Sequence, residues 1–309
     1  MASSPSAWSF TPYPSLPTAI LPNVLFYNAT NPSFNQTYQI SISYPFEWGS
    51  SPNVTNKTAL TMYVLDGNAL GLTAAEGFKR RKPVDSKQPD SIVVNVGYAL
   101  TDSVYALIQR RIDYTPRIPL REPMPYGADD FMSFVNRSLR PWVHRTVFPG
   151  VKLTRDALYG HSGGGLFAIY SLITDPDMFD TYIIASPALS LNNGSYLNDI
   201  TRRIGNGIDL PGELGVSNGT NMTGPAVFIG YGGAEQFPSR RRTETEADFQ
   251  TRKNFWQPQK MGEYSHELYD RIKASGRVRD VVLKEYPGQG HSGAGGSALL
   301  DGIDYFVDW

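Results

Sequence analysis

Hydrophobic and polar positions along the chain alternate between short apolar runs and longer amphipathic stretches. The short runs, rich in Val, Ile, Leu and Tyr, predict β-strands, and the longer stretches predict helices. Strands are expected at 20–27, 38–44, 59–65, 91–96, 157–159, 181–185, 226–230 and 281–286, and helices include 131–147 and 298–309. Because most strands are separated by helical stretches, the fold class is α/β, with a mostly parallel sheet covered by helices on both faces.

One five-residue segment carries the strongest chemical signal. Gly160-His161-Ser162-Gly163-Gly164 follows the short strand 157–159 and opens into the apolar helix pattern that begins at Gly165. This is a G-x-S-x-G nucleophile elbow in a strand–turn–helix context, and we expect both outer positions to require glycine. Ser162 is therefore the candidate nucleophile of a hydrolase. The alternative is a glycine-rich helix start that contains a serine by chance.

A serine nucleophile needs a histidine base, and the chain has four histidines. His144 precedes the serine, and His161 is the second residue of the elbow and points away from the nucleophile. His266 lies in a helical pattern with a charged face. His291 lies on the loop between the last strand and the last helix, which is where the base belongs in the order serine, acid, histidine. We therefore assign His291 as the base, against the alternative of a surface-loop histidine.

The acid that orients the histidine is expected after the strand at 226–230. Glu235 is the first carboxylate there and is the preferred candidate, while Glu244, Glu246 and Asp248 remain open. Each could instead be a solvated charge in an arginine-rich loop.

An oxyanion hole needs two backbone N–H donors, one of them from the residue after the nucleophile. Gly163 supplies the first. The second comes from Asn68 or Gly67, directly after the apolar strand 59–65, and we prefer Asn68.

Four sequence blocks carry a resemblance to a known family. They are Leu65-Asp66-Gly67-Asn68-Ala69-Leu70, the elbow with Leu166-Phe167, Ala185-Ser186-Pro187-Ala188-Leu189, and Pro287-Gly288-Gln289-Gly290-His291. Over roughly residues 20–309 the chain resembles the esterase-D-type α/β-hydrolases, and more narrowly the siderophore esterases, which cleave esters of iron-chelating cyclic trimers such as enterobactin and fusarinines. The resemblance implies an α/β-hydrolase fold and favours Asn68 as the second oxyanion donor.

The resemblance also directs attention to further residues. A stretch similar to one in the family, Arg110-Arg111-Ile112-Asp113-Tyr114-Thr115-Pro116, implies that Arg110 and Arg111 line the substrate pocket, or that they form a structural salt bridge. Two insertions, 190–224 and 234–262, are expected to roof the site at the carboxyl ends of the strands. The second carries aromatic residues that bind substrate or simply pack under a long loop: Phe237, Phe249, Phe255 and Trp256. Of these, Trp256 is the substrate-binding candidate.

Composition narrows the class of protein. The 309 residues are expected to form one domain, 1–309, with an extended N-terminal arm at 1–18. The net charge of −1 argues against nucleic-acid binding, and no run of apolar residues is long enough to span a membrane. No signal peptide is expected in the sequence as given, because the first residues lack an early positive charge and an apolar core. The oligomeric state stays unknown.

The compartment follows from two opposing observations. The sequence has no cysteine, which fits either compartment, and it has eight N-x-S/T sequons, at Asn28, Asn35, Asn53, Asn56, Asn136, Asn193, Asn218 and Asn221. A removed signal peptide would explain the sequons, and so would turns rich in Asn, Ser and Thr. We favour the cytoplasm, because the resemblance implies action on a siderophore already taken up.

These observations predict a serine esterase that works through an acyl-enzyme and needs neither a metal nor an organic cofactor. Its expected partner is a small-molecule ester, preferably a hydroxamate siderophore of the fusarinine type whose iron arrives with the substrate. The alternatives are a generic carboxylesterase, a lactonase or an acyltransferase acting on another secondary metabolite. A non-enzymatic alternative is an inactive hydrolase fold that serves as a binding protein.

Overall fold

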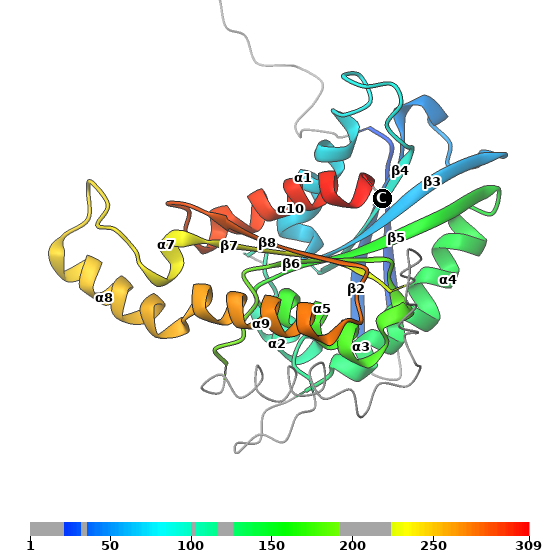
Figure 1. Ribbon diagram of the computed structural model, residues 1–309. Helices are drawn as coiled ribbons and strands as arrows, with labels where there is room; N and C mark the ends of the chain where they lie inside the picture. The colour runs from blue at the N-terminus through cyan, green and yellow to red at the C-terminus, as the bar shows by residue number, and fades with distance from the viewer. Residues whose placement is uncertain (1–21, 32–35, 100–102, 117–125, 192–223, 309) are drawn as a thin grey trace, which may run out of the picture.

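The computed structural model of the protein describes residues 22–31, 36–99, 103–116, 126–191 and 224–308. The described strands form a single twisted sheet in the order β1-β2-β4-β3-β5-β6-β7-β8 (Figure 1). The first two strands run antiparallel to their neighbours, and all the others are parallel. The strands are β1 Val24–Asn31, β2 Gln36–Ser43, β3 Lys57–Leu65, β4 Ser91–Tyr98, β5 Val151–His161, β6 Thr181–Ala185, β7 Ala226–Gly232 and β8 Asp280–Tyr286.

Helices cover both faces of this sheet, as Figure 1 shows. On one face lie α1 Gly67–Lys79 and α10 His291–Val307. The other face carries α5 Gly163–Thr174 and α9 Met261–Ser275 together with the segment before β5. The shorter helices are α2 Leu107–Asp113, α3 Ala128–Ser133, α4 Arg140–Trp142, α7 Gly233–Gln236 and α8 Glu246–Trp256. The expected α/β-hydrolase architecture is thus present.

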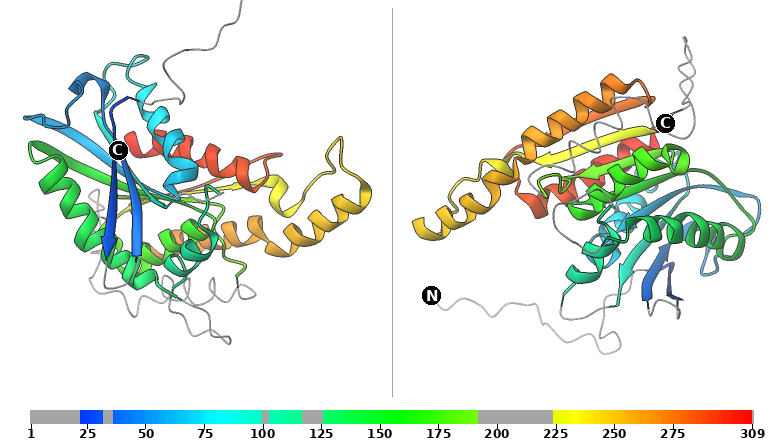
Figure 2. Two further views of the ribbon diagram at one scale, coloured as in Figure 1. Left: turned by 180° about the vertical axis from the view of Figure 1, so that it is seen from behind. Right: turned by 90° about the horizontal axis from the view of Figure 1, so that it is seen from below.

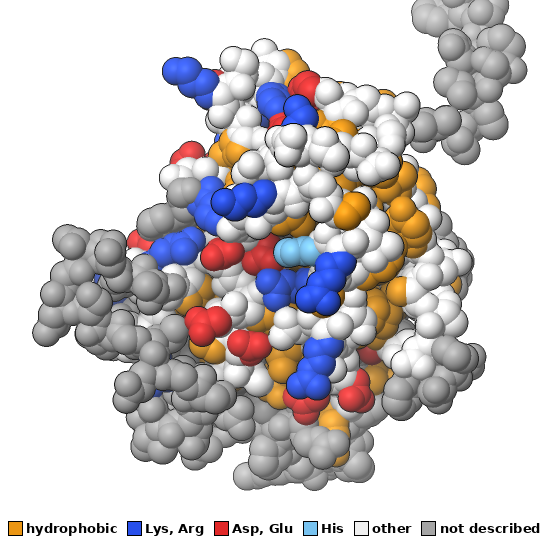
Figure 3. Space-filling model, turned by 90° about the vertical axis from the view of Figure 1, so that its right-hand side faces the viewer, with side chains coloured by type: hydrophobic (Ala, Val, Ile, Leu, Met, Phe, Trp, Pro, Cys, Tyr) orange, Lys and Arg blue, Asp and Glu red, His pale blue; other side chains and the backbone are white. Residues whose placement is uncertain are grey.

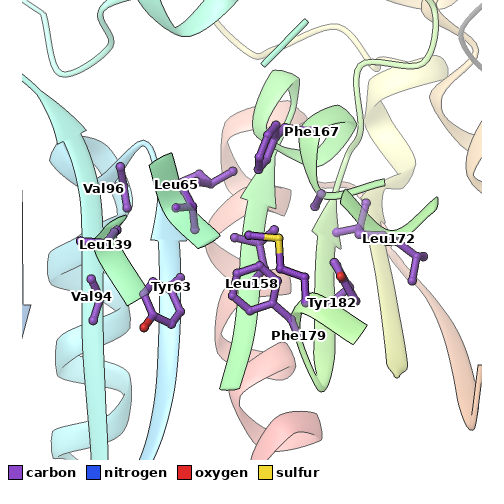
Figure 4. Packing of buried hydrophobic residues seen from close by; sticks show 14 of the residues in the cluster. Tyr63, Leu65, Val94, Val96, Leu139, Leu158, Phe167, Leu172, Phe179 and Tyr182 are labelled. Carbon is purple, nitrogen blue, oxygen red and sulfur yellow. The ribbon is translucent and has the colours of Figure 1, made fainter. Parts of the chain in front are cut away.

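Burial follows the position of each strand in the sheet. In β2, near the edge, Tyr38, Ile40 and Ile42 alternate with less buried residues, as expected for a strand that buries one face. In β7 every residue is buried, because helices cover both sides. Figure 4 shows strand side chains such as Leu158 and Tyr182 packing with Phe167 and Leu172 of α5.

Several predicted boundaries differ from the structure. β1 begins later than the expected strand 20–27 and ends at Asn31. β5 is much longer than the expected 157–159, because its first half pairs with β3 from Lys57 onward. The helical segment expected at 131–147 spans α3, α4 and two π-helical stretches, Phe134–Leu139 and Val143–Val147. The last helix begins at His291 rather than at 298.

The second insertion projects from the body of the protein. It forms α7, a loop and α8, and α8 extends away from the sheet in the views of Figure 2. No residue of α8 is fully buried. Most of the first insertion and the N-terminal arm at 1–18 lie outside the described residues.

Charged side chains of both signs occur on the face of the protein that Figure 3 shows. On the face in Figure 3, basic and acidic side chains are interspersed. Within the described residues, no helix has the length and apolar character needed to cross a membrane.

Candidate active site

The elbow is a sharp turn at the carboxyl end of β5. Ser162 has φ 58° and ψ −115°, a backbone conformation that few non-glycine residues adopt. A Cβ on Gly160 would lie 2.1 Å from the carbonyl oxygen of Gly164, so this position requires glycine. A Cβ on Gly164 would instead make an ordinary contact, 3.5 Å from the Cβ of Leu65. The expectation that both positions require glycine is therefore right for Gly160 and wrong for Gly164.

Strained backbone marks two more strand ends beside the elbow. Asp66 follows β3 with φ 52°, and Ser186 follows β6 with φ 39°. Because β3, β5 and β6 are neighbours in the sheet, these residues lie along one edge of it. Non-glycine residues with positive φ concentrate at functional sites, where the surrounding structure holds them in place.

Glu235 and His291 form a tight pair at the same edge. The Oε2 atom of Glu235 lies 2.6 Å from Nδ1 of His291. The other carboxylate oxygen, Oε1, accepts hydrogen bonds from the Ser186 hydroxyl at 2.6 Å and from the Gly232 backbone N–H at 2.7 Å. The Glu235 side chain is fully buried. Its orientation is fixed by three donors, which are Ser186, Gly232 and His291. A proton on Nδ1 held by this carboxylate leaves Nε2 of His291 available as a base.

The other candidate acids have partners of their own. Glu244 accepts two hydrogen bonds from the Arg252 guanidinium, both at 2.7 Å. Asp248 lies at the start of α8, where Thr245 caps the helix, and Glu246 accepts from Gln250. The structure therefore brings Glu235 to His291, and the three alternatives make other contacts.

Ser162 and His291 both lie among the described residues, and the Ser162 hydroxyl makes no hydrogen bond to His291 there. His291 begins α10, and the His161 Nε2 atom lies 3.0 Å from the His291 backbone oxygen. The ring of His161, next to Ser162 in sequence, contacts the ring of His291 at 4.4 Å between centroids. His291 is thus beside the elbow, and serine–histidine hydrogen bonds are often loose in enzymes without substrate.

Two helix starts place the candidate oxyanion donors. Asn68 and Gly163 lie in the first turns of α1 and α5, where backbone N–H groups have no partner within the helix. The Asn68 side chain bonds to Tyr98 in both directions, accepting from its N–H at 2.7 Å and donating to its carbonyl at 3.0 Å. These two hydrogen bonds tie the start of α1 to the end of β4 and fix the direction of the Asn68 side-chain amide.

Arg110 forms the structural salt bridge that the sequence left as an alternative. Its guanidinium donates to both oxygens of Asp66, at 2.8 and 2.7 Å, and both side chains are largely buried. Arg110 also borders the elbow, because a Cβ on Gly163 would lie 3.4 Å from its Nη2 atom. Arg111 is exposed on α2. Trp256, at the end of α8, lies against His291 with 4.9 Å between ring centroids.

Other polar clusters are distinct from this site. His266 lies on α9, and its Nε2 atom is 3.1 Å from the Tyr231 hydroxyl. His144 lies elsewhere in the sequence, and burial lowers its pKa. A hollow of about 630 Å³ borders β1, β2, α2 and α3 and is lined by residues such as Asp113 and Tyr38. Among the described residues, no group of three or more His, Cys, Asp or Glu is arranged to hold a metal ion.

Sequence reasoning gave no role to two residues that contact the candidate catalytic groups. Ser186 was visible only as part of a family block, and its bond to Glu235 depends on β6 and β7 being neighbours. The sequence predicts that His161 points away from the nucleophile, and the structure shows its ring in contact with His291. Neither contact follows from spacing along the chain.

Comparisons with known proteins show the family to which the chain belongs. A family model described as a putative esterase matches residues 31–269. The chain is 37% identical over 277 residues to a siderophore enterobactin esterase of Emericella nidulans, covering 86% of this chain and 88% of that protein. It is 30% identical to a siderophore triacetylfusarinine C esterase of Aspergillus fumigatus, covering 89% and 90%. The solved structure of siderophore hydrolase EstA from Aspergillus nidulans matches with a TM-score of 0.83 at 34% identity, covering 98% of this chain and 99% of that one.

Proposed function

The chain belongs to the putative esterase family, and we propose on that premise that it hydrolyses carboxylic ester bonds of a siderophore, with Ser162 as nucleophile. The observation that carries the assignment of residues is the 2.6 Å contact between Glu235 and His291 beside the strained elbow. A buried carboxylate that orients an imidazole next to a serine in this conformation is the arrangement that acyl transfer requires.

Each step uses a group already described. His291 takes the proton of the Ser162 hydroxyl as the oxygen attacks the ester carbonyl, and the backbone N–H groups of Asn68 and Gly163 receive the oxyanion. The imidazolium then protonates the leaving alcohol, which leaves an acyl-enzyme. Water attacks this ester with His291 again as base, so that acid is released and Ser162 is restored. Glu235 holds the imidazole in the tautomer that both halves need.

The substrate proposed first is a cyclic hydroxamate trimer of the fusarinine type. The A. fumigatus relative supports it, since its name specifies triacetylfusarinine C. The arginine side chains give only weak electrostatic grounds for preferring the acetylated form, which is neutral when iron-loaded. Arg110 pairs with Asp66, Arg252 pairs with Glu244, and Arg240 lies near Glu246, so much of this positive charge is neutralised.

A catecholate trimer of the enterobactin type is the second candidate. It is favoured by the E. nidulans relative, which is named an enterobactin esterase and has the higher identity of the two. Both candidates present ester bonds in a bulky, rigid ring, so binding energy far from the reacting bond is expected to raise turnover relative to small esters.

The test is to incubate the protein with ferri-triacetylfusarinine C, ferri-fusarinine C, ferri-enterobactin, p-nitrophenyl butyrate and a simple lactone, and to identify products by mass spectrometry. We expect linear fragments from at least one trimer, and their loss in Ser162→Ala, where removal of the nucleophile costs on the order of 10⁶ in kcat. Turnover of only the simple esters or the lactone would place the protein among generic carboxylesterases or lactonases. Binding of a trimer without turnover of any ester would favour an inactive binding protein.

A further inference from the structure

Two aromatic rings from different elements lie against the imidazole of His291. The His161 ring, at the end of β5, has its centroid 4.4 Å away and is inclined by 40°. The Trp256 indole, at the end of α8, is 4.9 Å away and inclined by 39°. With Glu235 at Nδ1, these contacts define the surroundings of the ring.

The His161 ring is held in a restricted space. It is 4% exposed, and its Nε2 atom lies 3.0 Å from the His291 backbone oxygen, so the proton of a neutral His161 belongs on Nε2. A Cβ on Gly295 of α10 would come within 2.9 Å of His161 Cδ2. Burial, and then the nearby His291, lower the pKa of His161 to about 3. His161 is therefore a neutral neighbour at ordinary pH and adds no positive charge beside the base.

Trp256 provides a different kind of neighbour. An indole ring attracts a cation that lies within about 6 Å of its centroid, because its π-face carries negative charge density. The base becomes an imidazolium in each half of the proposed reaction, and the indole lies within that range. No residue of α8 is fully buried, and the adjacent Phe255 is 59% exposed. The partly buried Trp256 thus contacts His291 from a helix that otherwise packs little.

We propose that Trp256 is a positioning residue that stabilises the protonated imidazole of His291, while neutral His161 packs against the same ring without opposing its charge. This rests on the proposed function in one respect, that His291 is the base. Among the described residues, the charged and titratable groups near His291 include Glu235 on α7, His161 on β5 and, beyond Gly163, the Arg110–Asp66 pair. Trp256 is not titratable, and its contribution is separable from theirs by substitution.

The experiment is an NMR titration of the histidine ring protons in a Ser162→Ala background, where no turnover is needed. The chain has four histidines, so each resonance can be assigned by single His→Gln substitutions. Trp256→Leu should lower the pKa of His291 by about half a unit to one unit, the size of a cation–π contact expressed as a pKa shift. Trp256→Phe, which keeps an aromatic ring, should restore most of the value. His161 should not titrate between about pH 5 and 8.

The sign of the shift separates the proposal from a purely structural role. If the indole acted only by shielding His291 from water, its removal would raise the pKa, because desolvation disfavours the charged form. A rise, no change, or an equal fall in the Leu and Phe variants would overturn the proposal, as would a His161 that titrates normally. Trp142→Leu, at a partly buried tryptophan on α4, is the control and should leave the pKa of His291 unchanged. The titration needs no substrate. Its result can therefore contradict the role of Trp256 while the esterase assignment holds, and can support that role while the esterase assignment fails.

Discussion

Two buried carboxylates flank the elbow, and they differ in the partner that each one holds. Glu235 holds His291, which takes up and releases a proton in the proposed reaction, whereas Asp66 holds Arg110, whose guanidinium stays charged at any ordinary pH. Glu235 receives its other hydrogen bonds from Ser186 and Gly232, and Asp66 has the Tyr114 hydroxyl at its backbone N–H.

The comparison shows how one kind of contact serves two purposes. The Glu235–His291 pair can gain and release a proton during turnover, so its geometry bears on rate. The charges of Asp66 and Arg110 stay fixed during turnover. Their ion pair ties α2 to Asp66, the residue with positive φ that precedes α1, so its geometry bears on stability. Substitutions in the two pairs should therefore separate into effects on kcat and effects on unfolding.

The largest expected effect is at His291. His291→Ala should lower kcat for p-nitrophenyl butyrate by on the order of 10⁶, close to the effect of removing the nucleophile. Its melting temperature should fall less than that of Asp66→Asn, because the His291 side chain is partly exposed and the buried Glu235 carboxylate keeps its hydrogen bonds from Ser186 and Gly232. Steady-state kinetics and thermal unfolding measure both. A variant that keeps a tenth of the activity would contradict the role of His291.

Glu235→Gln should cost less, about 10⁴ in kcat, since removing the orienting carboxylate generally costs less than removing the base. The matched control is Glu244→Gln, whose carboxylate pairs with Arg252 and should be dispensable for turnover. The acid would be misplaced if Glu235→Gln behaved as the wild type while substitution of Glu244, Glu246 or Asp248 abolished activity.

In the second pair, Asp66→Asn should act mainly on stability. It leaves the buried Arg110 charge without its partner, and breaking a buried pair from one side costs about 3–5 kcal/mol. Adding Arg110→Met should recover part of the loss, because the unpaired charge is then gone. Denaturant unfolding of the single and double variants measures this. Wild-type stability of Asp66→Asn with a loss of kcat as large as in Glu235→Gln would remove the distinction between the pairs.

Ser186→Ala should have a smaller effect on rate. It removes one of the two donors to Oε1 of Glu235, and a hydrogen bond to a charged group contributes about 1.5–3 kcal/mol, of which the remaining donor retains part. We expect kcat to fall by about tenfold with little change in KM. Ser171→Ala, at a buried serine of α5 whose hydroxyl donates to the sulfur of Met178, should leave kcat unchanged.

A third buried carboxylate sharpens the comparison because its partners are neutral. Asp113 accepts from Tyr98, Gln109 and Gln36, and burial raises its pKa to about 6. A carboxyl with a raised pKa stabilises the fold below its unfolded-state pKa and loses that contribution as pH rises through the folded-state value. Relative to Asp113→Asn, the wild type should therefore lose about 2–3 kcal/mol between pH 4 and pH 7. A constant difference across this range would contradict the assignment.

The sequence predicted most of the architecture and the central residues of the site. The strand–helix alternation and the glycine at Gly160 follow from local requirements, and the chain order points to Ser162, Glu235 and His291. The predicted strand omits the first half of β5, although the alternation of Val151 and Leu153 with Lys152 and Thr154 is itself typical of a strand, and pairing with β3 holds this half extended. The early start of α10 was missed because glycine-rich sequence has low helix propensity, which packing of Gly295 against His161 overrides.

Contacts between elements explain what else the sequence missed. The bond between Ser186 and Glu235 and the contact of His161 with His291 depend on strand order in the sheet. The sequence leaves Arg110 either as a substrate-pocket residue or as part of a structural salt bridge. Only the fold decides between them, because its partner Asp66 is far away in the sequence.

The most direct test of the account is to trap the nucleophile. The protein is treated with diethyl p-nitrophenyl phosphate, which transfers its phosphoryl group to an activated serine, and the modified peptide is identified by mass spectrometry. The account predicts one adduct per chain on Ser162, and none when His291→Ala is treated in the same way. An adduct on Ser186, or no adduct on a folded and soluble wild type, would contradict it.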